Sequence, residues 1–287
     1  MWKTILRRFL VMIPQLFVLS LLIFIMAQFM PGDPFTGKIS PETDPARIEE
    51  LREKYGLNDP WYQQYVRWIG NAAQGEFGNS YTYQIKVSTL LGERALNTFW
   101  LSLVTVILLY AIAIPLGVIA GRFQDSLFDR GVMLYSFVTY AIPTFVLALL
   151  FIYFFGFKLG WFPTTGSVDI RQDAGTFGYV WSKIYHLFLP AFTSAILGTT
   201  GVIQFLRSEV IDAKSMDFVR TARSKGVPQR KVYSRHIFRN SLLPIAAFIG
   251  FTITGLLGGS IFIETIFGYP GMGQLFISSI SSRDYSV

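Results

Sequence analysis

The chain has 287 residues, of which 52% are hydrophobic and only 15% are charged. Soluble domains carry about a quarter charged residues, so this composition excludes an ordinary water-soluble protein and indicates a membrane protein. The lack of cysteine excludes disulfides and thiolate metal sites, and the two histidines, His186 and His236, are too few and too far apart in sequence for a histidine metal site. The net charge of +7 is informative mainly through its distribution along the chain.

Five apolar stretches are long enough to cross a bilayer, which takes about 20 mostly apolar residues. The first follows Lys3, Arg7 and Arg8 and runs on to the bulky Phe29 and Met30 without a small-residue cleavage site. We therefore interpret it as an uncleaved helix and not as a signal peptide. The five predicted spans are residues 9–30, 99–120, 132–155, 187–206 and 242–263, and kinks are expected at Pro14, Pro115 and Pro143.

The segment between the first two spans, residues 31–98, has a helical pattern of its own. Asp44 and Pro45 begin a predicted helix that ends at Gly56. A second apolar stripe follows, made by Trp61, Tyr65, Trp68 and Ile69, and such a stripe is typical of local packing or of anchoring at the membrane surface. We predict a small helical cap on the outer face, which is a candidate contact for a substrate-delivering protein.

The loops between the predicted spans fall into two groups of different charge. With the N-terminus in the cytoplasm, residues 1–8, 121–131 and 207–241 lie inside and hold 14 Lys and Arg against 5 Asp and Glu. The outside segments hold 11 Lys and Arg against 13 Asp and Glu. Because short cytoplasmic loops carry the excess of Lys and Arg, this orientation is the expected one.

Residues 207–241 carry nine Lys and Arg and are therefore predicted to be a cytoplasmic loop. Each such charge costs roughly 2.5 to 3.5 kcal/mol at the centre of a membrane helix. The loop also has apolar positions at helical spacing, in two groups separated by Gly226 and Pro228. We predict two short amphipathic helices, one with Phe218, Val219 and Ala222 on its apolar side and the other with Val232, Tyr233, His236 and Ile237.

Three functions suit such a loop. A DNA-binding helix-turn-helix would use the positive charge, but tethering to spans at both ends leaves little room to enter a groove, so no nucleic acid is expected as a partner. A solvated loop in contact with lipid needs no apolar sides and no fixed Gly-Val-Pro corner. A docking element for a cytoplasmic protein needs both, and we favour this interpretation.

The loop sequence DFVRTARSKGVPQRKVYSRHIFRNSLLP resembles the cytoplasmic loop of permease subunits of bacterial ABC importers, in the form typical of the dipeptide, oligopeptide and nickel branch. The common importer motif begins Glu-Ala-Ala, with glycine six positions after the Glu. Arg220, Thr221 and Ala222 stand at the first three places, and Gly226 matches the glycine. Arg-Thr-Ala is the usual variant of the peptide branch. Further segments resemble this branch in the same order along nearly the whole chain, among them MPGDP, RALNTFWLSL, LGWFPTTG and IETIFGYPGMGQLF.

This resemblance is strongest to the B-type permease subunit of oligopeptide and dipeptide systems. It implies an all-α polytopic membrane protein with the type I ABC importer permease fold, in which the loop is a coupling helix seated on the ATP-hydrolysing subunit. Residues 220–226 would contact the ATPase, and four later residues would brace the loop. The predicted coupling residues are Arg220, Thr221, Ala222, Arg223, Gly226, Pro228, Arg230, His236, Arg239 and Asn240. From its sequence surroundings alone, apart from the family resemblance, His236 is interpreted as a structural hydrogen-bonding residue.

The sequence contains no GxxxxGK[ST] phosphate loop, so the chain cannot hold ATP by that means. The resemblance implies that ATP is bound by two cytoplasmic ATPase subunits or domains, and that this chain has no catalytic residue, cofactor or metal. The other implied partners are a homologous permease subunit, an external substrate-binding protein and membrane lipid. The expected substrate is an oligopeptide or a dipeptide, with nickel or another small solute as the alternative.

A self-sufficient secondary transporter or channel is a second alternative from another class. Such carriers commonly place charged residues in the middle of their spans, and the predicted spans have none there. Glu264 follows the fifth span, where we expect it to be solvated, at a helix terminus or in a loop contact.

The predicted organisation has three parts: residues 1–30 with the cytoplasmic N-terminus and first span, residues 31–98 outside, and residues 99–287 with four spans and the coupling loop. The resemblance implies six spans with the C-terminus inside and a location in the bacterial cytoplasmic membrane. Five spans are readable, so a sixth is expected to be missing at the C-terminus.

Overall fold

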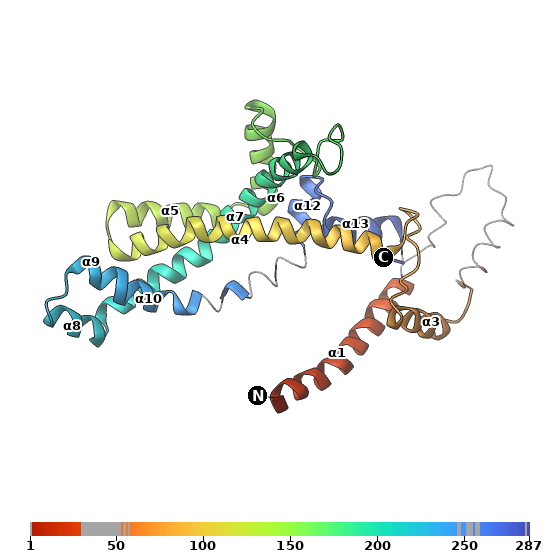
Figure 1. Ribbon diagram of the computed structural model, residues 1–287, viewed down its shortest axis with the longest axis horizontal. Helices are drawn as coiled ribbons and strands as arrows, with labels where there is room; N and C mark the ends of the chain where they lie inside the picture. Colours follow the sequence, from red (N-terminus) through yellow and green to blue (C-terminus); the bar gives the residue numbers. More distant parts are fainter. Residues whose placement is uncertain are drawn as a thin grey trace. The chain divides into compact units, whose positions relative to one another are not determined.

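The computed structural model is built of helices (Figure 1). It describes residues 2–29, 53, 56, 58–245, 248–250, 255, 259–284 and 286–287. Within these residues the regular structure is helical, apart from one isolated antiparallel bridge between Asn79 and Lys86. The elements, with π-helices written η, are α1 (Trp2–Gln28), α3 (Trp61–Ala73), α4 (Val87–Arg122), α5 (Leu127–Ala141), α6 (Thr144–Phe151), η1 (Ile152–Lys158), α7 (Phe177–Ser215), α8 (Asp217–Ser224), α9 (Gln229–Lys231), η2 (Val232–Ile237), α10 (Phe238–Ser241), α12 (Ile261–Ile266) and α13 (Met272–Ser282).

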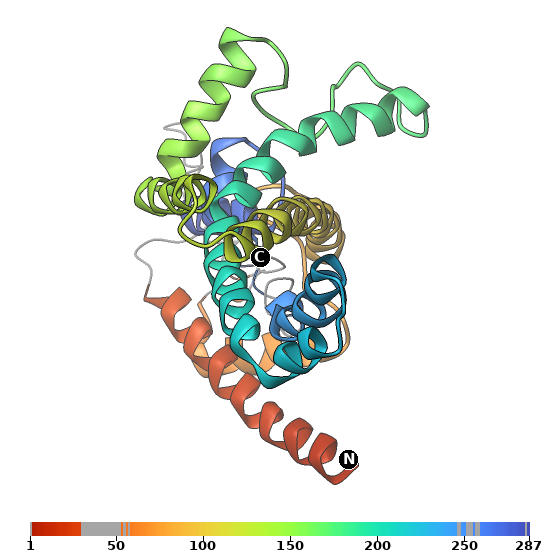
Figure 2. The same ribbon diagram turned by 90° about the vertical axis from the view of Figure 1, so that its left-hand side faces the viewer.

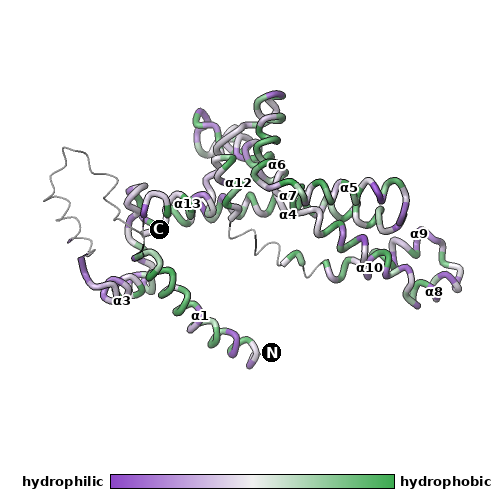
Figure 3. The backbone as a smooth tube through the Cα atoms, turned by 180° about the vertical axis from the view of Figure 1, so that it is seen from behind, coloured by the Kyte–Doolittle hydropathy of each residue, from purple (hydrophilic) through white to green (hydrophobic). Residues whose placement is uncertain are grey.

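Three of the described helices, α1, α4 and α7, are long and apolar enough to cross a membrane. They contain most of the predicted first, second and fourth spans, so these three spans are confirmed as helices. Figure 3 shows α1 as hydrophobic over most of its length, with hydrophilic residues at its N-terminal end. The predicted fifth span, residues 242–263, lies largely outside the described residues.

The predicted span of residues 132–155 is broken at Pro143, where a kink is expected from the sequence. The chain there forms α5 and then α6 with η1, and the two pieces are bent by 103° (Figure 2). Pro143 has no N–H to donate, and its ring disfavours a helical conformation at the residue before it. Ile142 is accordingly extended, with φ −80° and ψ 122°. Pro115, by contrast, lies inside α4 without breaking it.

The chain forms two compact units, residues 1–92 with 276–287 and residues 93–275. In the first unit, the aromatic stripe of α3 packs on α1. Tyr65 is buried, with its ring centroid 6.0 Å from that of Phe17 and 5.3 Å from that of Phe24. Its hydroxyl also lies 2.9 Å from Ser20 Oγ. Tyr65 of the stripe therefore serves local packing, whereas Trp61 is exposed. The helix predicted from Asp44 to Gly56 lies largely outside the described residues.

The C-terminal residues of the first unit are held by the buried carboxylate of Asp284. Ser80 Oγ donates to Asp284 Oδ2 across 2.5 Å, and the backbone N–H groups of Tyr81 and Thr82 donate to the same carboxylate across 3.1 and 2.9 Å. Hydrogen bonds of this kind, from backbone to a charged acceptor, are among the stronger ones. They fix the loop after residue 79 to the end of the chain.

The second unit has one core that joins long helices to the short helices of the charged loop. Ile203, Leu206 and Val210 of α7 are fully buried in it, and so are Val219 of α8 and Val232 of η2. α4 and α5 contribute further buried side chains to the same cluster. The loop helices are therefore part of the core of this unit.

α4 and α7 approach closely because glycine lies between them. A Cβ built on Gly121 would lie 2.8 Å from the backbone oxygen of Arg207 and 2.8 Å from Val210 Cβ. A Cβ on Gly117 would lie 3.1 Å from the backbone oxygen of Ile203. Small residues at such positions let two helix backbones meet without an intervening side chain. The contact fixes the C-terminal end of α4 beside the end of α7.

We expect Gly121→Ala to destabilise the protein by about 1 to 3 kcal/mol, because the methyl group must displace packed atoms of α7. Gly131→Ala in α5 is the matched control. A Cβ there meets no atom within 4 Å, and alanine favours a helix by about 0.5 to 1 kcal/mol over glycine. Thermal unfolding in detergent compares the two variants. Equal melting temperatures would contradict the close approach of α4 and α7.

Candidate functional site

The first loop helix, α8, has one apolar side and one charged side, as its sequence predicts. Val219 is fully buried and Ala222 is buried beside it, while Phe218 packs partly against the same core. The opposite side is exposed and carries Arg220, Thr221 and Arg223. Burying an aliphatic side chain of this size contributes about 1.5 to 3 kcal/mol. The apolar side of α8 is thus already covered by the chain's own core.

Gly226 ends α8 in the way the sequence predicts. The Gly226 N–H donates to the Arg223 carbonyl across 2.9 Å, and the Val227 N–H donates to the Ala222 carbonyl across 3.1 Å. This pair of bonds is the Schellman arrangement, which satisfies the last carbonyls of a helix. It requires φ of +72° at Gly226, a left-handed conformation that glycine adopts without a steric penalty.

The second part of the loop runs from Pro228 through α9 and η2 into α10. Its predicted apolar side is confirmed, because Val232 and Ile237 are buried and Tyr233 and His236 are half-buried. The π-helical form of η2 is not encoded in the apolar spacing that predicts the helix. Asn240 Nδ2 donates to the His236 carbonyl across 2.6 Å, within the same segment.

The side of the loop that faces away from the core is cationic. Its exposed Lys and Arg residues are Arg220, Arg223, Lys225, Arg230, Lys231, Arg235 and Arg239. Asp217 is the one acidic residue between 217 and 241, and it lies 3.6 Å from the guanidinium of Arg220, with the two side chains 96% and 74% exposed. An ion pair this exposed adds little stability, so Arg220 remains available for a partner.

The helices α8–α10 are braced by residues of α4 and α7 that the sequence does not reveal as partners. The Arg122 guanidinium at the end of α4 lies 4.7 Å from the ring centroid of Tyr233. Lys214 Nζ donates to the Arg122 carbonyl across 3.1 Å, and Ser241 Oγ donates to the Glu209 carbonyl across 3.2 Å. These contacts join the ends of α4 and α7 to the second half of the loop.

A buried ion pair fixes the start of α5 to α7. Arg207 donates to both oxygens of Asp129, from Nε across 2.6 Å and from Nη2 across 2.7 Å. Asp129 is only 2% exposed, and its Oδ2 also accepts the backbone N–H of Asp125 across 2.8 Å. Ser126, whose Oγ accepts the N–H of Asp129, marks this helix start in the sequence. Nothing in the sequence pairs Asp129 with Arg207.

The expectation that Glu264 is solvated is wrong, because its side chain is fully buried. It does lie at a helix terminus, in the first turn of α12. Thr98 Oγ1 donates to Oε1 across 3.0 Å, the Ser260 N–H donates to Oε1 across 3.3 Å, and the Gln274 N–H donates to Oε2 across 3.0 Å. A carboxylate is favoured at the N-terminus of a helix, and here these donors replace water.

Glycine and tyrosine of the segment after α12 complete this buried site. A Cβ on Gly271 would lie 2.5 Å from Glu264 Cδ, so only glycine leaves room for the carboxylate. Burial, together with the negative charge of Glu264, raises the pKa of the Tyr269 phenol above its ordinary value. The phenol therefore stays protonated and donates to the Asn97 carbonyl across 3.2 Å.

The geometry of the loop suits the docking of a partner. Its apolar side is covered, and its exposed side offers guanidinium and ammonium groups that suit an acidic partner. In the described part of the chain, no group of three His, Asp or Glu residues is placed to hold a metal ion. The three described helices of spanning length indicate an integral membrane protein.

Two family models match the chain. Residues 113–287 match the family described as binding-protein-dependent transport system inner membrane component, and residues 1–102 match the N-terminal part of such membrane components. The chain therefore belongs to the inner membrane components of binding-protein-dependent transport systems. The family match confirms the resemblance to importer permease subunits that the sequence of the loop and of the other segments indicates.

Relatives match over almost the whole chain. The oligopeptide transport system permease protein AppB of Bacillus subtilis (strain 168) is 40% identical over 284 residues, which are 99% of this chain and 89% of the relative. The glutathione transport system permease protein GsiC of Escherichia coli (strain K12) is 34% identical over 287 residues, which are 100% of this chain and 89% of the relative.

We expect Gly226→Ala to destabilise the end of α8 by about 1 to 2 kcal/mol, because alanine is strained in a left-handed conformation. A Cβ at Gly226 meets no atom within 4 Å, so crowding adds nothing to this cost. Gly226→Asn should recover part of the loss, since asparagine tolerates this conformation. Amide hydrogen exchange at Val227 measures the effect, and unchanged exchange in both variants would contradict the Schellman ending.

We expect Asp129→Asn to destabilise the protein by about 3 to 5 kcal/mol, because it leaves the Arg207 guanidinium without its buried partner. Asp125→Asn is the matched control. Asp125 is exposed and has φ of +65°, which asparagine accepts. Thermal unfolding compares the variants. The double variant Asp129→Asn with Arg207→Gln should be more stable than Asp129→Asn alone, and the opposite order would contradict the pairing.

Proposed function

We propose that this protein is a permease subunit of an ATP-driven importer of oligopeptides or dipeptides, and that the α8–α10 loop couples it to an ATPase. The observation that carries the proposal is the two-sided loop. Its apolar side lies in the same core as α4 and α7, while its cationic side is exposed. A loop that only followed the membrane surface would need no such core.

The proposed substrate class rests on the relatives. The two relatives described above are named for the transport of oligopeptides and of glutathione, and glutathione is itself a small peptide. Identities of 40% and 34% over nearly the whole chain support a shared substrate class. Peptides are therefore favoured over nickel and other small solutes.

The proposed partners follow from the family. Its description names dependence on a binding protein, which supports an external protein that delivers the substrate. A homologous permease subunit would complete the translocation path, and two cytoplasmic ATPase subunits or domains would bind and hydrolyse ATP. This chain would itself hold no cofactor, and membrane lipid would surround its exposed apolar helices.

The proposed orientation places the N-terminus and the loop in the cytoplasm. The excess of Lys and Arg over residues 1–8, 121–131 and 207–241 supports it. The exposed cations of the loop then face the side on which ATP is available. The location would be the bacterial cytoplasmic membrane.

The connection between α7 and α8 supports a mechanical role. α7 ends at Ser215 and α8 begins at Asp217, so only Met216 lies between them, in an extended conformation. Because Val219 and Val232 are buried in the core that contains α7, a displacement of α8 has to move the ends of the long helices as well. Of the ten coupling residues predicted above, those in α8 and at its end would contact the ATPase directly.

We expect Arg220→Glu to reduce ATP-driven peptide uptake by about tenfold or more, because it reverses a charge at the proposed contact. The variant should still insert and fold, since Arg220 is exposed and its contact with Asp217 contributes little. Arg130→Glu is the matched control, because Arg130 is also exposed and lies at the start of α5, outside the loop. Uptake and ATPase activity are measured in proteoliposomes with the partner subunits.

Normal uptake by Arg220→Glu, or an equal loss in Arg130→Glu, would contradict the coupling role of the loop. Transport by the chain alone, without any ATPase, would instead favour a secondary transporter or channel and would overturn the importer proposal.

A further inference from the structure

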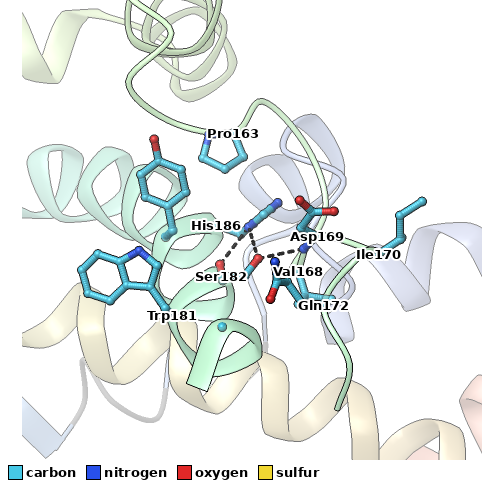
Figure 4. Close-up of a pocket in the computed structure, with 10 residues that line it drawn as sticks. Pro163, Val168, Asp169, Ile170, Gln172, Trp181, Ser182 and His186 are labelled. Carbon is cyan, nitrogen blue, oxygen red and sulfur yellow. Dashed lines mark hydrogen bonds between the residues drawn. The ribbon is translucent and has the colours of Figure 1, made fainter. Parts of the chain in front are cut away.

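A hollow of about 610 Å³ lies beside the N-terminal part of α7 (Figure 4). One wall is the segment before α7, from Pro163 to Gln172. The other wall is one side of the helix, where the lining residues follow helical spacing: Gly178, Trp181, Ser182, Tyr185 and His186. Pockets for small organic ligands have volumes of about 300 to 1,000 Å³. None of these residues belongs to the coupling loop.

The two walls are joined by Ser182. Its buried hydroxyl accepts the backbone N–H of Asp169 across 2.8 Å, which holds the Asp169 side chain at the rim of the hollow. His186 Nδ1 lies 2.8 Å from the Ser182 carbonyl oxygen. Because a carbonyl only accepts, His186 Nδ1 is the donor in this contact. The polar groups of the hollow are therefore fixed before any ligand binds.

The lining is complementary to a positive charge. Asp169 is the one acidic residue among the lining residues, and neither Lys nor Arg lines the hollow. Asp169 Oδ1 accepts the backbone N–H of Arg171 across 3.0 Å. The side chains of Trp181 and Tyr185 are 60% and 38% exposed, so they are open to a ligand. A carboxylate and exposed aromatic rings together suit an ammonium group.

We propose that this hollow binds the free amino terminus of a short peptide, with the ammonium group on the Asp169 carboxylate and the first residue against Trp181. The inference rests on the proposed function as a peptide importer and adds a substrate contact to it. An ammonium group on a short chain is the ligand that the charge and the volume both fit. Because Asp169 is exposed, the contact is weak, and a transport path requires a substrate to be released again.

The test uses the purified chain in lipid nanodiscs, without ATPase or substrate-binding protein. The probe is trialanine amide, which carries one positive charge, and binding is followed by saturation-transfer NMR. We expect Asp169→Asn to weaken binding by about two- to fivefold, as for loss of an exposed charge pair. Trp181→Ala should weaken it as well. N-acetyl-trialanine amide, which has no ammonium group, should not bind.

Asp173→Asn is the matched control, because Asp173 is an exposed acid of the same segment that does not line the hollow. It should bind trialanine amide like the wild type. The Asp169→Asn variant keeps its backbone bond to Ser182, and an unchanged melting temperature shows that it is folded.

Absence of binding to the folded wild type, equal binding of the acetylated probe, or equal losses in Asp169→Asn and Asp173→Asn would each overturn the inference. So would a variant Asp169→Asn that binds peptide normally but loses affinity for the substrate-binding protein. Peptide uptake by the assembled importer is measured in parallel. If the assembled importer takes up peptide but the chain does not bind trialanine amide, only the proposed peptide site in the hollow is contradicted. If the chain binds trialanine amide but the assembly takes up no peptide, only the proposed importer function is contradicted.

Discussion

The burial of the apolar sides of α8 and η2 against the long helices is the constraint on which the described arrangement depends. Val219, Val232 and Ile237 leave almost no surface to solvent, and each contributes about 1.5 to 3 kcal/mol when buried. The loop could not leave α4 and α7 without exposing all three. Its orientation is therefore fixed, and its arginine and lysine side chains are held on one outward side. A binding surface that is ordered in advance loses less entropy when a partner docks.

α4 is held near both of its ends by polar contacts of buried or half-buried groups. Near one end, Thr98 donates to the buried carboxylate of Glu264. At the other end, Lys214 donates to the last carbonyl of the helix, and Arg122 lies over the ring of Tyr233. Between these contacts, Thr105 Oγ1 donates to the Ala191 carbonyl across 3.5 Å, and Gly117 and Gly121 pack against α7. Polar groups with defined partners set the register of packed helices more strictly than apolar contact does, because an unpaired buried group costs free energy.

Local features could be predicted from the sequence, whereas distant pairs could not. The apolar sides of the loop helices follow from residue spacing, and the end of α8 follows from Gly226, since both depend on a few neighbouring residues. Pro143 predicts a kink, but the size of the bend depends on how α5 and α6 pack. The burial of Glu264 and the pairing of Asp129 with Arg207 depend on residues far away along the chain. The position of Glu264 at the end of a predicted span therefore suggested solvent, and the charge count left Arg207 as one more loop cation.

α7 connects the two surfaces to which function is assigned. Its N-terminal turns form one wall of the hollow next to Asp169, and its C-terminal end leads through Met216 into α8. With 39 residues it is about 58 Å long at 1.5 Å per residue, which exceeds the hydrocarbon thickness of a bilayer of about 30 Å. Pro190 lies within the helix without interrupting it. This one helix therefore joins the wall of the hollow to the loop for which we propose contact with an ATPase.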